Sequence, residues 1–365
     1  MKPTHLFFFV LIFQTVFQSE NSFSEMRQPR PVLIIESETN GIIWQSIVDL
    51  LWHEGTLYVL DNSLSQAHVV TEDGNYIGLL AGEGDGPGDL RNPSSISING
   101  NGNIVVCSKM FGKCEEFDSE SKTLLRSFTL HSLESEAICH VFRVEWKNEW
   151  RYEHYLFQKI EGTNVIRETR ISKFESDGKE HVLYKHQSER NWKELNERAE
   201  VPFTKEAWGV DKKGLLWCAE NWEKPVLTNP LTGQEKILGS YRPRRRSKVE
   251  IQKITNELKQ YGGIEKIDLW PTKRAVLAIE FDSGMCMLGE AEKGEIESYI
   301  LCGSNVPGGQ ISIQKPIIEK ENKVYLLGNH LIAFVYDEAM EYESSWGETI
   351  QGPCIVVVSY EGSGL

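Results

Sequence analysis

A short apolar segment followed by a polar loop recurs six times along the chain, and this repeat constrains the fold more than any other feature. The segments hold four to six apolar residues rich in Val, Ile, Tyr and Trp, which favours buried β-strands over helices. They read TLYVLD, NIVVCS, EHYLFQ, GLLWCAE, RAVLAIEF and NKVYLLGN. With Leu57, Ile104, Tyr155, Leu215, Val276 and Val324 taken as equivalent, the spacings are 47, 51, 60, 61 and 48 residues.

Two further signals accompany each repeat. A turn tetrad follows each segment, and most of the tetrads have hairpin-turn chemistry: EDGN, SESK, SDGK, PLTG, EKGE and EAME. Another apolar segment precedes each one: SIVDLLW, SSISI, CHVFRVEW, AWGVD, IEKIDLW and IQKPII. Four antiparallel strands in each of six units predict an all-β, six-bladed β-propeller, because radial closure leaves only short sheet edges.

The predicted propeller is a single domain over residues 25–365. Its blades are expected at residues 46–93, 94–135, 136–205, 206–261, 262–311 and 312–350. Residues 32–36, VLIIE, have no repeat of their own, and we expect them to close the ring as the outer strand of the last blade. We predict short helical insertions in blades 3 and 4, at residues 188–200 and 247–263, which would account for the two long spacings. In the second insertion, Ser247 and Glu250 form a capping box.

The N-terminus predicts export. Residues 6–17 form an apolar run that is too short to span a bilayer, which needs about 20 residues, but fits a secretory signal peptide. The small residues Ser22 and Ser24 precede Glu25, so we expect a signal peptide at residues 1–24. The chain is then periplasmic or extracellular, with no transmembrane segment.

The net charge of -14 argues against a nucleic-acid partner and against adhesion to an anionic membrane. The basic run at residues 242–248 stands alone and favours a local salt-bridging or partner-docking patch. The seven cysteines contain no CxxC pair, which excludes zinc ribbons and thioredoxin-like redox motifs. Cys107 and Cys114 flank a short loop across which they could pair.

Residues 81–93, AGEGDGPGDLRNP, concentrate glycine in one place. No frame matches GxGxxG, the Walker A lysine is absent, and Asp85 and Asp89 lack the ligand spacing of an EF-hand. We interpret the stretch as the corner between the outer strand of one blade and the inner strand of the next, where glycine adopts positive φ without steric cost. Pro87-Gly88 suits a type II turn there.

The stretch GEGDGPGDLRNPSSISINGNGNIVV, followed by KCEEFD, resembles the NHL-repeat consensus. LYVLDNSLSQAHVVTEDG resembles the second half of such a repeat, with Asp61 at its acidic position. The resemblance covers residues 46–118 and implies an NHL-repeat-like, six-bladed β-propeller family of exported bacterial proteins. Relatives with enzymatic activity include gluconolactonase-like lactonases and amidating lyases, which use metal ions.

A lactonase-like site would place carboxylates and Asn on inner strands around calcium or zinc. The candidates are Asp49, Glu145, Asp211, Glu265 and Asp268. They do not recur at one phase of the strand, and no G-x-S-x-G nucleophile elbow occurs. We therefore expect a protein without catalytic residues or cofactor, and keep a metal-dependent hydrolase or lyase as the alternative.

The sequence thus predicts an exported, non-enzymatic propeller that binds a protein, peptide or glycan on the face carrying its inter-blade loops. By topology, this loop face holds the glycine stretch and the loops at residues 61–66, 108–113 and 219–225. The candidate binding residues on it are Asp61, Asp85, Arg91, Lys109, Phe111 and Trp222.

Overall fold

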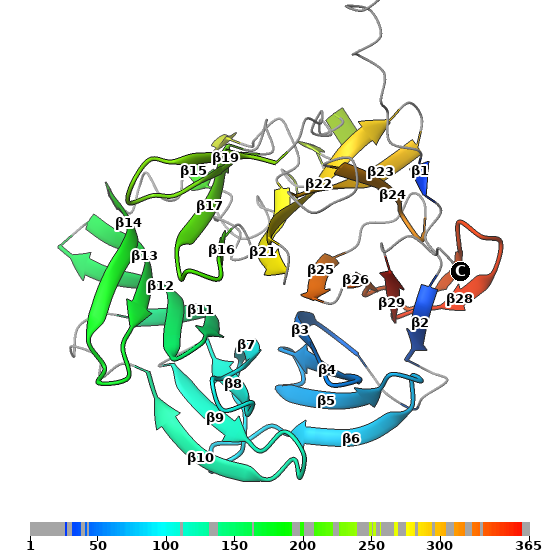
Figure 1. Cartoon of the computed structure of the whole chain (residues 1–365), viewed down its shortest axis with the longest axis horizontal. Coiled ribbons are helices and arrows are strands. Elements are labelled where there is room, and N and C mark those ends of the chain that lie inside the picture. The colour runs from blue at the N-terminus through cyan, green and yellow to red at the C-terminus, as the bar shows by residue number, and fades with distance from the viewer. Residues whose placement is uncertain are drawn as a thin grey trace, which may run out of the picture.

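The computed structural model is a ring of β-sheets in which the strands of each sheet run in order from the centre to the rim (Figure 1). It describes residues 26–27, 31–37, 41, 44–109, 112–130, 138–162, 164–191, 198–200, 208–221, 226–238, 248–249, 251–252, 256, 266–268, 275–281, 284–293, 296–303, 310–317, 323–328 and 331–359. The predicted signal peptide, Phe111, Trp222, Glu265 and most of the basic run at 242–248 lie outside the described residues.

Six antiparallel sheets form the blades. Blade 1 holds β3 (Ile47–His53), β4 (Thr56–Asp61), β5 (Gln66–Thr71) and β6 (Tyr76–Ala81). Blade 2 holds β7 (Pro93–Ile98), β8 (Ile104–Ser108), β9 (Lys113–Phe117) and β10 (Leu124–Thr129). Blade 3 holds β11 (Ile138–Lys147), β12 (Trp150–Glu161), β13 (Asn164–Phe174) and β14 (Glu180–Asn191).

Blade 4 holds β16 (Trp208–Val210), β17 (Leu216–Asn221), β18 (Val226–Thr228) and β19 (Glu235–Ile237). Blade 5 holds β21 (Ala275–Phe281), β22 (Gly284–Lys293), β23 (Ile296–Gly303) and β24 (Gln310–Gln314), with β1 (Met26–Arg27) added in parallel to β24. Blade 6 holds β25 (Lys323–Gly328), β26 (Leu331–Tyr336), β29 (Cys354–Ser359) and β2 (Pro31–Glu36). Two small sheets pair β15 (Arg198–Glu200) with β20 (Lys266–Asp268), and β27 (Glu341–Glu343) with β28 (Thr349–Gln351).

The two ends of the described chain close the ring. β2 pairs antiparallel with β29, so a strand from the start of the chain is the outer strand of blade 6. Leu33 and Ile35 alternate inwards along β2, and both pack in the cluster that contains Leu57 and Val59 of blade 1. The segment at 32–36, for which the sequence predicts ring closure, lies in this strand.

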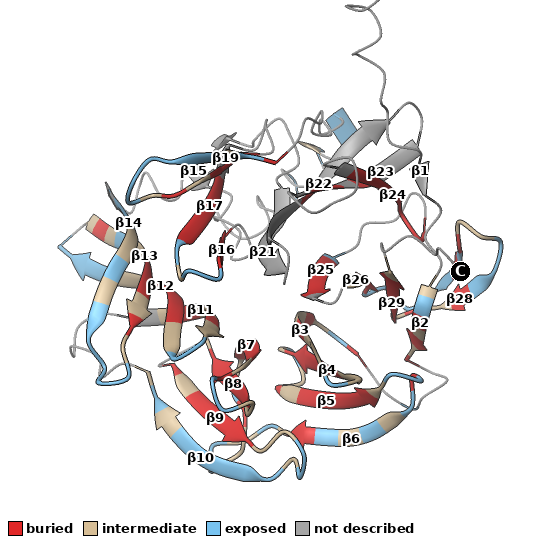
Figure 2. Ribbon diagram, viewed as in Figure 1, coloured by how far each residue is buried: buried red, intermediate tan, exposed pale blue. Residues whose placement is uncertain are grey.

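The apolar core is divided among the seams between neighbouring blades. One cluster joins Leu60 and Val69 of blade 1 to Ile104 of blade 2, and another joins Cys107 of blade 2 to Tyr155 of blade 3. Buried residues therefore concentrate in the inner and middle strands, and exposed ones at the rim, as on β6 and β10 (Figure 2). Each blade presents two apolar faces, which explains the apolar runs in the sequence.

The positions predicted for the strands within blades 5 and 6 are wrong. RAVLAIEF and NKVYLLGN, expected as second strands, are the innermost strands β21 and β25. IQKPII was expected as the first strand of blade 6, but its first two residues are the end of β24 in blade 5. IEKIDLW was expected as the first strand of blade 5, but it contains β20, which pairs with β15 in a separate small sheet. In a meander of antiparallel strands, every strand is followed by a turn. The alternation of apolar segments and turns in the sequence therefore predicts where strands lie, but does not show which strand of a blade is innermost.

The helical insertion predicted in blade 3 is also wrong. Its first residues, Ser188–Asn191, belong to β14, where they pair with Arg167–Asn164 of β13. Cross-strand pairing overrides the helical preference of a charged segment that lacks Gly and Pro. In the blade 4 insertion, the described residues 248–249, 251–252 and 256 have helical backbone. The complete helix over 247–263 stays a prediction.

Candidate functional site

The glycine stretch connects β6 of blade 1 to β7 of blade 2, and it folds into a closed loop. The Leu90 N–H donates to the Gly82 carbonyl at 2.8 Å, and the Gly84 N–H donates back to the Leu90 carbonyl at 3.1 Å. The Asp89 carboxylate accepts the Gly86 N–H at 2.9 Å. At Gly84 a Cβ atom would lie 2.3 Å from that carboxylate, so the loop requires glycine there for space.

Blade 2 holds this loop in place. The Lys113 ammonium on β9 donates to the carbonyls of Gly86 at 2.8 Å and Asp89 at 3.2 Å. It also pairs with the buried carboxylate of Glu115 at 2.7 Å, and Glu115 accepts the Gly88 N–H at 3.0 Å. The glycine stretch is therefore a buttressed inter-blade corner, and the side chains that fix it could not be recognised from glycine content.

Hydrogen bonds join the loops of blades 1, 2 and 3 into one continuous face. The Asn62 side chain donates to Asn92 Oδ1 at 2.6 Å, and the Asn92 N–H donates to Ser65 Oγ at 3.2 Å. The Lys109 N–H then donates to the Asn92 carbonyl, and the Val141 N–H to the Lys109 carbonyl, each at 2.8 Å. Ser65 and Asn92 have positive φ, 50° and 54°, and these bonds hold both in that conformation. The loop face is pre-organised in this region.

Asp61 is a structural part of this face. Its side chain is fully buried at the end of β4 and accepts backbone N–H groups of Gln45 at 2.6 Å, Ser46 at 3.2 Å and Leu64 at 3.1 Å. A charged acceptor shared by three donors fixes the entry of the chain into β3 and the turn after β4. Among the predicted binding residues that the structure describes, Asp61 is thus the one buried away from solvent.

Asp85, Arg91 and Lys109 lie on the loop face as the topology predicts. The Arg91 guanidinium pairs with the Asp85 carboxylate at 2.7 Å, and both side chains are more than 70% exposed. The Lys109 ammonium lies 5.8 Å from the centre of the Phe142 ring. In the described part of the chain Lys109 enters no ion pair. These three residues are near one another in the loops, while binding by any of them stays a prediction.

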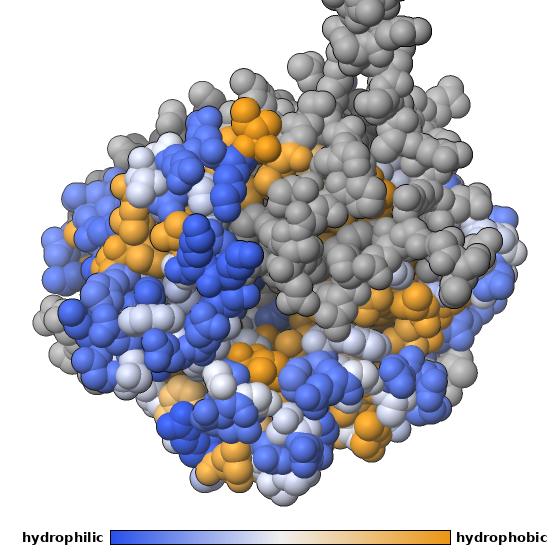
Figure 3. All heavy atoms as spheres, viewed as in Figure 1, coloured by the Kyte–Doolittle hydropathy of each residue, from blue (hydrophilic) through white to orange (hydrophobic). Residues whose placement is uncertain are grey.

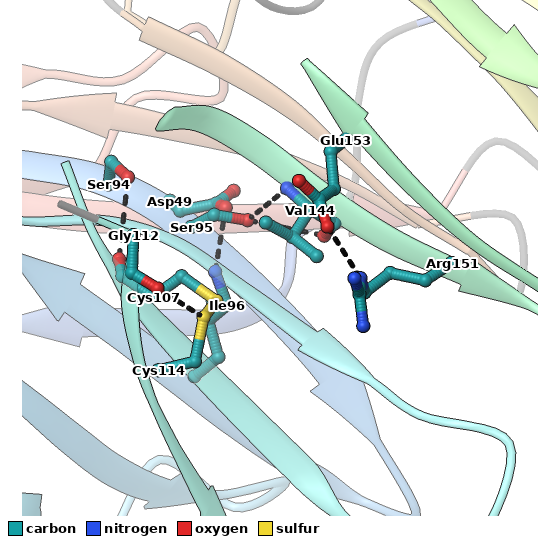
Figure 4. Close-up of a disulfide and its surroundings, with 10 residues drawn as sticks. All are labelled: Asp49, Ser94, Ser95, Ile96, Cys107, Gly112, Cys114, Val144, Arg151 and Glu153. Atoms are coloured by element: carbon teal, nitrogen blue, oxygen red, sulfur yellow. Dashed lines mark hydrogen bonds and ion pairs between the residues drawn. A yellow bond between two sulfur atoms is a disulfide. The ribbon is translucent and has the colours of Figure 1, made fainter. Parts of the chain in front are cut away.

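The innermost strands of blades 1 to 4 are bridged from each blade to the next, and Figure 4 shows the first two of these bridges. Asp49 Oδ2 on β3 accepts the Ile96 N–H of β7 at 3.0 Å. Ser95 Oγ on β7 accepts the Val144 N–H of β11 at 3.0 Å, and Arg143 on β11 donates to the Trp208 carbonyl of β16 at 2.8 Å. In each case a side chain of one blade satisfies the free backbone edge of the next.

Three of the residues that the sequence singled out as metal candidates already have partners within the fold. Asp49 accepts backbone N–H groups, and Glu145 pairs with Arg143 at 2.7 Å. Asp211 accepts the Trp217 indole N–H at 2.9 Å and caps the turn after β16. Burial alone would raise the pKa of Asp211, but these hydrogen bonds and Lys236 hold it below its usual value. Asp268 lies in β20, which pairs with β15 in a two-stranded sheet separate from the blade sheets.

Within the described ranges, no group of three or more His, Cys, Asp or Glu is placed to hold a metal ion. The same part of the chain contains no helix with the length and apolar character needed to cross a membrane. Cys107 of β8 and Cys114 of β9, which lie opposite each other in the hairpin, form a disulfide (Figure 4). Figure 3 shows one face of the ring, on which the described apolar residues form several separate patches and a hollow lies near the centre.

The family model described as a 6-bladed beta-propeller matches residues 16–212, more than half of the chain. The chain belongs to this six-bladed β-propeller family. The match covers blades 1 to 3 and the start of blade 4. No curated protein matches the sequence.

Solved structures with similar folds differ widely in kind. A candidate exported protein from Bacteroides fragilis has 11% identity and a TM-score of 0.44, covering 84% of this chain and 83% of that one. The Cps50 (Swd1) propeller domain from Myceliophteria thermophila has 8% identity and a TM-score of 0.48, with 91% and 100% covered. A gluconolactonase from Xanthomonas campestris has 10% identity and a TM-score of 0.43, with 92% and 98% covered. Likeness at this level says nothing about what the chain binds.

Proposed function

We propose that this propeller is an exported, non-enzymatic binding protein whose loop face engages a protein, peptide or glycan. The observation that supports it is the hydrogen-bonded network from Asn62 through Asn92 to Lys109 and Val141, which fixes the loops of three blades relative to one another. A face that is rigid before binding loses little conformational entropy when a partner docks. The exposed charges of Asp85 and Arg91 and the half-buried Lys109 lie on this fixed base.

The channel residues favour binding over catalysis. Asp49, Glu145 and Asp211 each contact a specific donor of the fold, so recruiting them to a metal would break bridges between blades or caps of turns. The alternative, a metal-dependent hydrolase or lyase using calcium or zinc, predicts a stoichiometric ion in the purified protein. Elemental analysis that finds one such ion per chain would replace the binding function with this alternative.

Site-specific photo-crosslinking tests the binding function. A benzophenone amino acid is placed at Arg91 on the loop face and, as the matched control, at Lys179 in the exposed β13–β14 turn on the opposite face. Expressed in the organism of origin, the Arg91 variant should yield a discrete adduct that the Lys179 variant does not. Adducts of equal yield from both positions, or from Lys179 alone, would contradict a dedicated loop face.

Export is tested separately from binding. N-terminal sequencing of the protein recovered from cell-envelope and extracellular fractions should begin at Glu25 if the signal peptide spans residues 1–24. A chain that starts at Met1 in the cytoplasmic fraction would overturn the export part of the proposal and leave the binding face to be judged on the crosslinks.

A further inference from the structure

Blade 3 has longer outer strands than blade 1, and it extends further on the loop face. β12 and β14 each span 12 residues, whereas the equivalent strands of blade 1, β4 and β6, span six. The hydrogen bond from the Val141 N–H to the Lys109 carbonyl marks the level of the neighbouring loop, and Val141 pairs with Tyr155 of β12. Residues 156–169 therefore continue beyond that level as a raised hairpin, which we call the blade 3 extension.

The two faces of this extension differ in charge. Directly paired residues share a face, so Leu156, Gln158 and Ile160 of β12 lie on the same face as Thr169, Arg167 and Val165 of β13. None of these six is acidic. The opposite face carries Glu161 and Glu168 among its residues, and there Glu168 pairs with Lys185 at 2.6 Å and Lys159 with Glu161 at 3.0 Å. The charges of the second face are balanced, and the first face is basic.

Lys109 of blade 2 lies beside His140, because its carbonyl accepts the N–H of the adjacent Val141 at 2.8 Å. His140 pairs with Leu156 and so lies on the same face as Arg167. The Lys109 ammonium lies over the ring of Phe142, 5.8 Å from its centre, and that ring is in turn 5.4 Å from the ring of His154 on the same face. Burial lowers the pKa of His140 below its usual value, and the nearby positive charges of Lys109 and Arg167 lower it further. Lys109 and Arg167 thus both lie near His140.

We propose that Lys109, His140 and Arg167 form an anion subsite that takes a carboxylate of an acidic peptide segment. The inference deepens the proposed binding function and rests on it. Lys109 and Arg167 supply the permanent charges, and the half-buried His140 supplies a ring nitrogen. In a chain of net charge -14, clustering like charges at one place is a local inversion of sign, which orients an acidic ligand towards this part of the face.

The surroundings favour a peptide over a glycan. A sugar that stacks on an aromatic side chain needs an open ring face, and the Phe142 ring is already contacted by Lys109 and by the ring of His154. Beside the charges, Leu156 is half-buried and Ile160 is 52% exposed. Apolar contacts next to a cationic pair suit a peptide in which hydrophobic residues flank an acidic one.

The test measures fluorescence anisotropy of labelled hexaglutamate titrated with the full chain at low salt. The variants are Lys109→Gln and Arg167→Gln, and the matched control is Lys159→Gln, which removes the same charge from the opposite face of the same extension. We expect saturable binding that each subsite variant weakens about two- to five-fold and the double variant about ten-fold, as for partly exposed ion pairs. The control should bind as the wild type does, and circular dichroism checks that every variant is folded.

Three results would overturn the proposal. The first is no saturable binding of hexaglutamate, and the second is equal weakening by Lys159→Gln and Arg167→Gln, which would mean general electrostatics. The third is tighter binding of an oligogalacturonate of equal charge, which would make the ligand an acidic glycan. If hexaglutamate does not bind but the Arg91 crosslink forms, the loop face still binds a partner and only the anion subsite is wrong.

Discussion

Acid should weaken the ring through one buried histidine on β5. His68 is 3% exposed and lies between Trp44 and Tyr76, with ring centres 5.0 and 5.9 Å away. Its Nδ1 atom is 3.3 Å from the Tyr76 hydroxyl. Burial lowers the pKa of His68 from 6.5 to about 4, against the smaller opposing effect of the negative charge of Asp61. The neutral imidazole is therefore the form that the folded ring accepts.

The sign and size of the effect follow from proton linkage. Between pH 6.5 and 4 the unfolded chain binds a proton at His68 that the folded chain does not, so stability is complete above pH 6.5 and falls as the pH falls through this window. The full loss is about 3 kcal/mol, of which about 2 kcal/mol is lost between pH 7 and pH 5. Because Trp44 precedes β3 and packs in the cluster that contains Leu33 of β2, the loss falls on the seam that closes the ring.

Urea unfolding at pH 7 and pH 5 measures this effect, with His68→Phe as the comparison. Phenylalanine keeps an aromatic ring and cannot titrate, and its lost contact with the Tyr76 hydroxyl lowers stability at both pH values alike. The wild type should lose about 2 kcal/mol more than the variant between the two pH values. A difference below about 0.5 kcal/mol would show that His68 titrates as it does in the unfolded chain, and would refute the reasoning.

Three further changes test the loop face. Asp61→Ala leaves three backbone N–H groups without their acceptor and should lower the free energy of unfolding by about 3 kcal/mol or more; a loss below about 1 kcal/mol in urea would contradict its structural role. Gly84→Ala places a methyl group 2.3 Å from a carboxylate oxygen and should cost about 1–3 kcal/mol, whereas Gly82→Ala meets nothing within 4 Å and should change thermal stability by less than about 0.5 kcal/mol. Replacing Cys107 and Cys114 by serine opens a loop of sequence separation 7 and should cost about 2–3 kcal/mol; added reductant should then destabilise the wild type and leave the double variant unchanged.

The architecture could be read from the sequence because a propeller repeats its burial pattern. Segments such as TLYVLD and NIVVCS are buried on both faces in β4 and β8, so they stand out as apolar runs at blade spacing. The place of each strand within its blade was harder to predict. The innermost strands β21 and β25 are apolar like the second strands of other blades, and only the order of strands in the sheet distinguishes them. The glycine stretch was placed correctly as a corner, since its chemistry is that of a turn.

The polar contacts that hold the loop face together could not be predicted from the sequence pattern. Glu115 fixes the glycine loop from a strand 27 residues beyond Gly88, and nothing in the pattern KCEEF separates it from a solvated glutamate. The height of blade 3 was mistaken for a helical insertion, because charged residues of a raised strand resemble those of a surface helix. Both features depend on which strands are neighbours, and local sequence does not carry that information.

The contacts between the innermost strands follow a pattern that is visible in the sequence only as a position, and not as a residue type. The bridges from Asp49, Ser95 and Arg143 reach backbone groups 47, 49 and 65 residues further along the chain, close to the spacing from one blade to the next. An aspartate, a serine and an arginine thus perform the same task at equivalent places, namely satisfying the inner edge of the following blade. A search for one recurring residue type fails on such a ring, as it did for the carboxylates. A search for any hydrogen-bonding side chain at the recurring position would identify Asp49 as a bridge between blades.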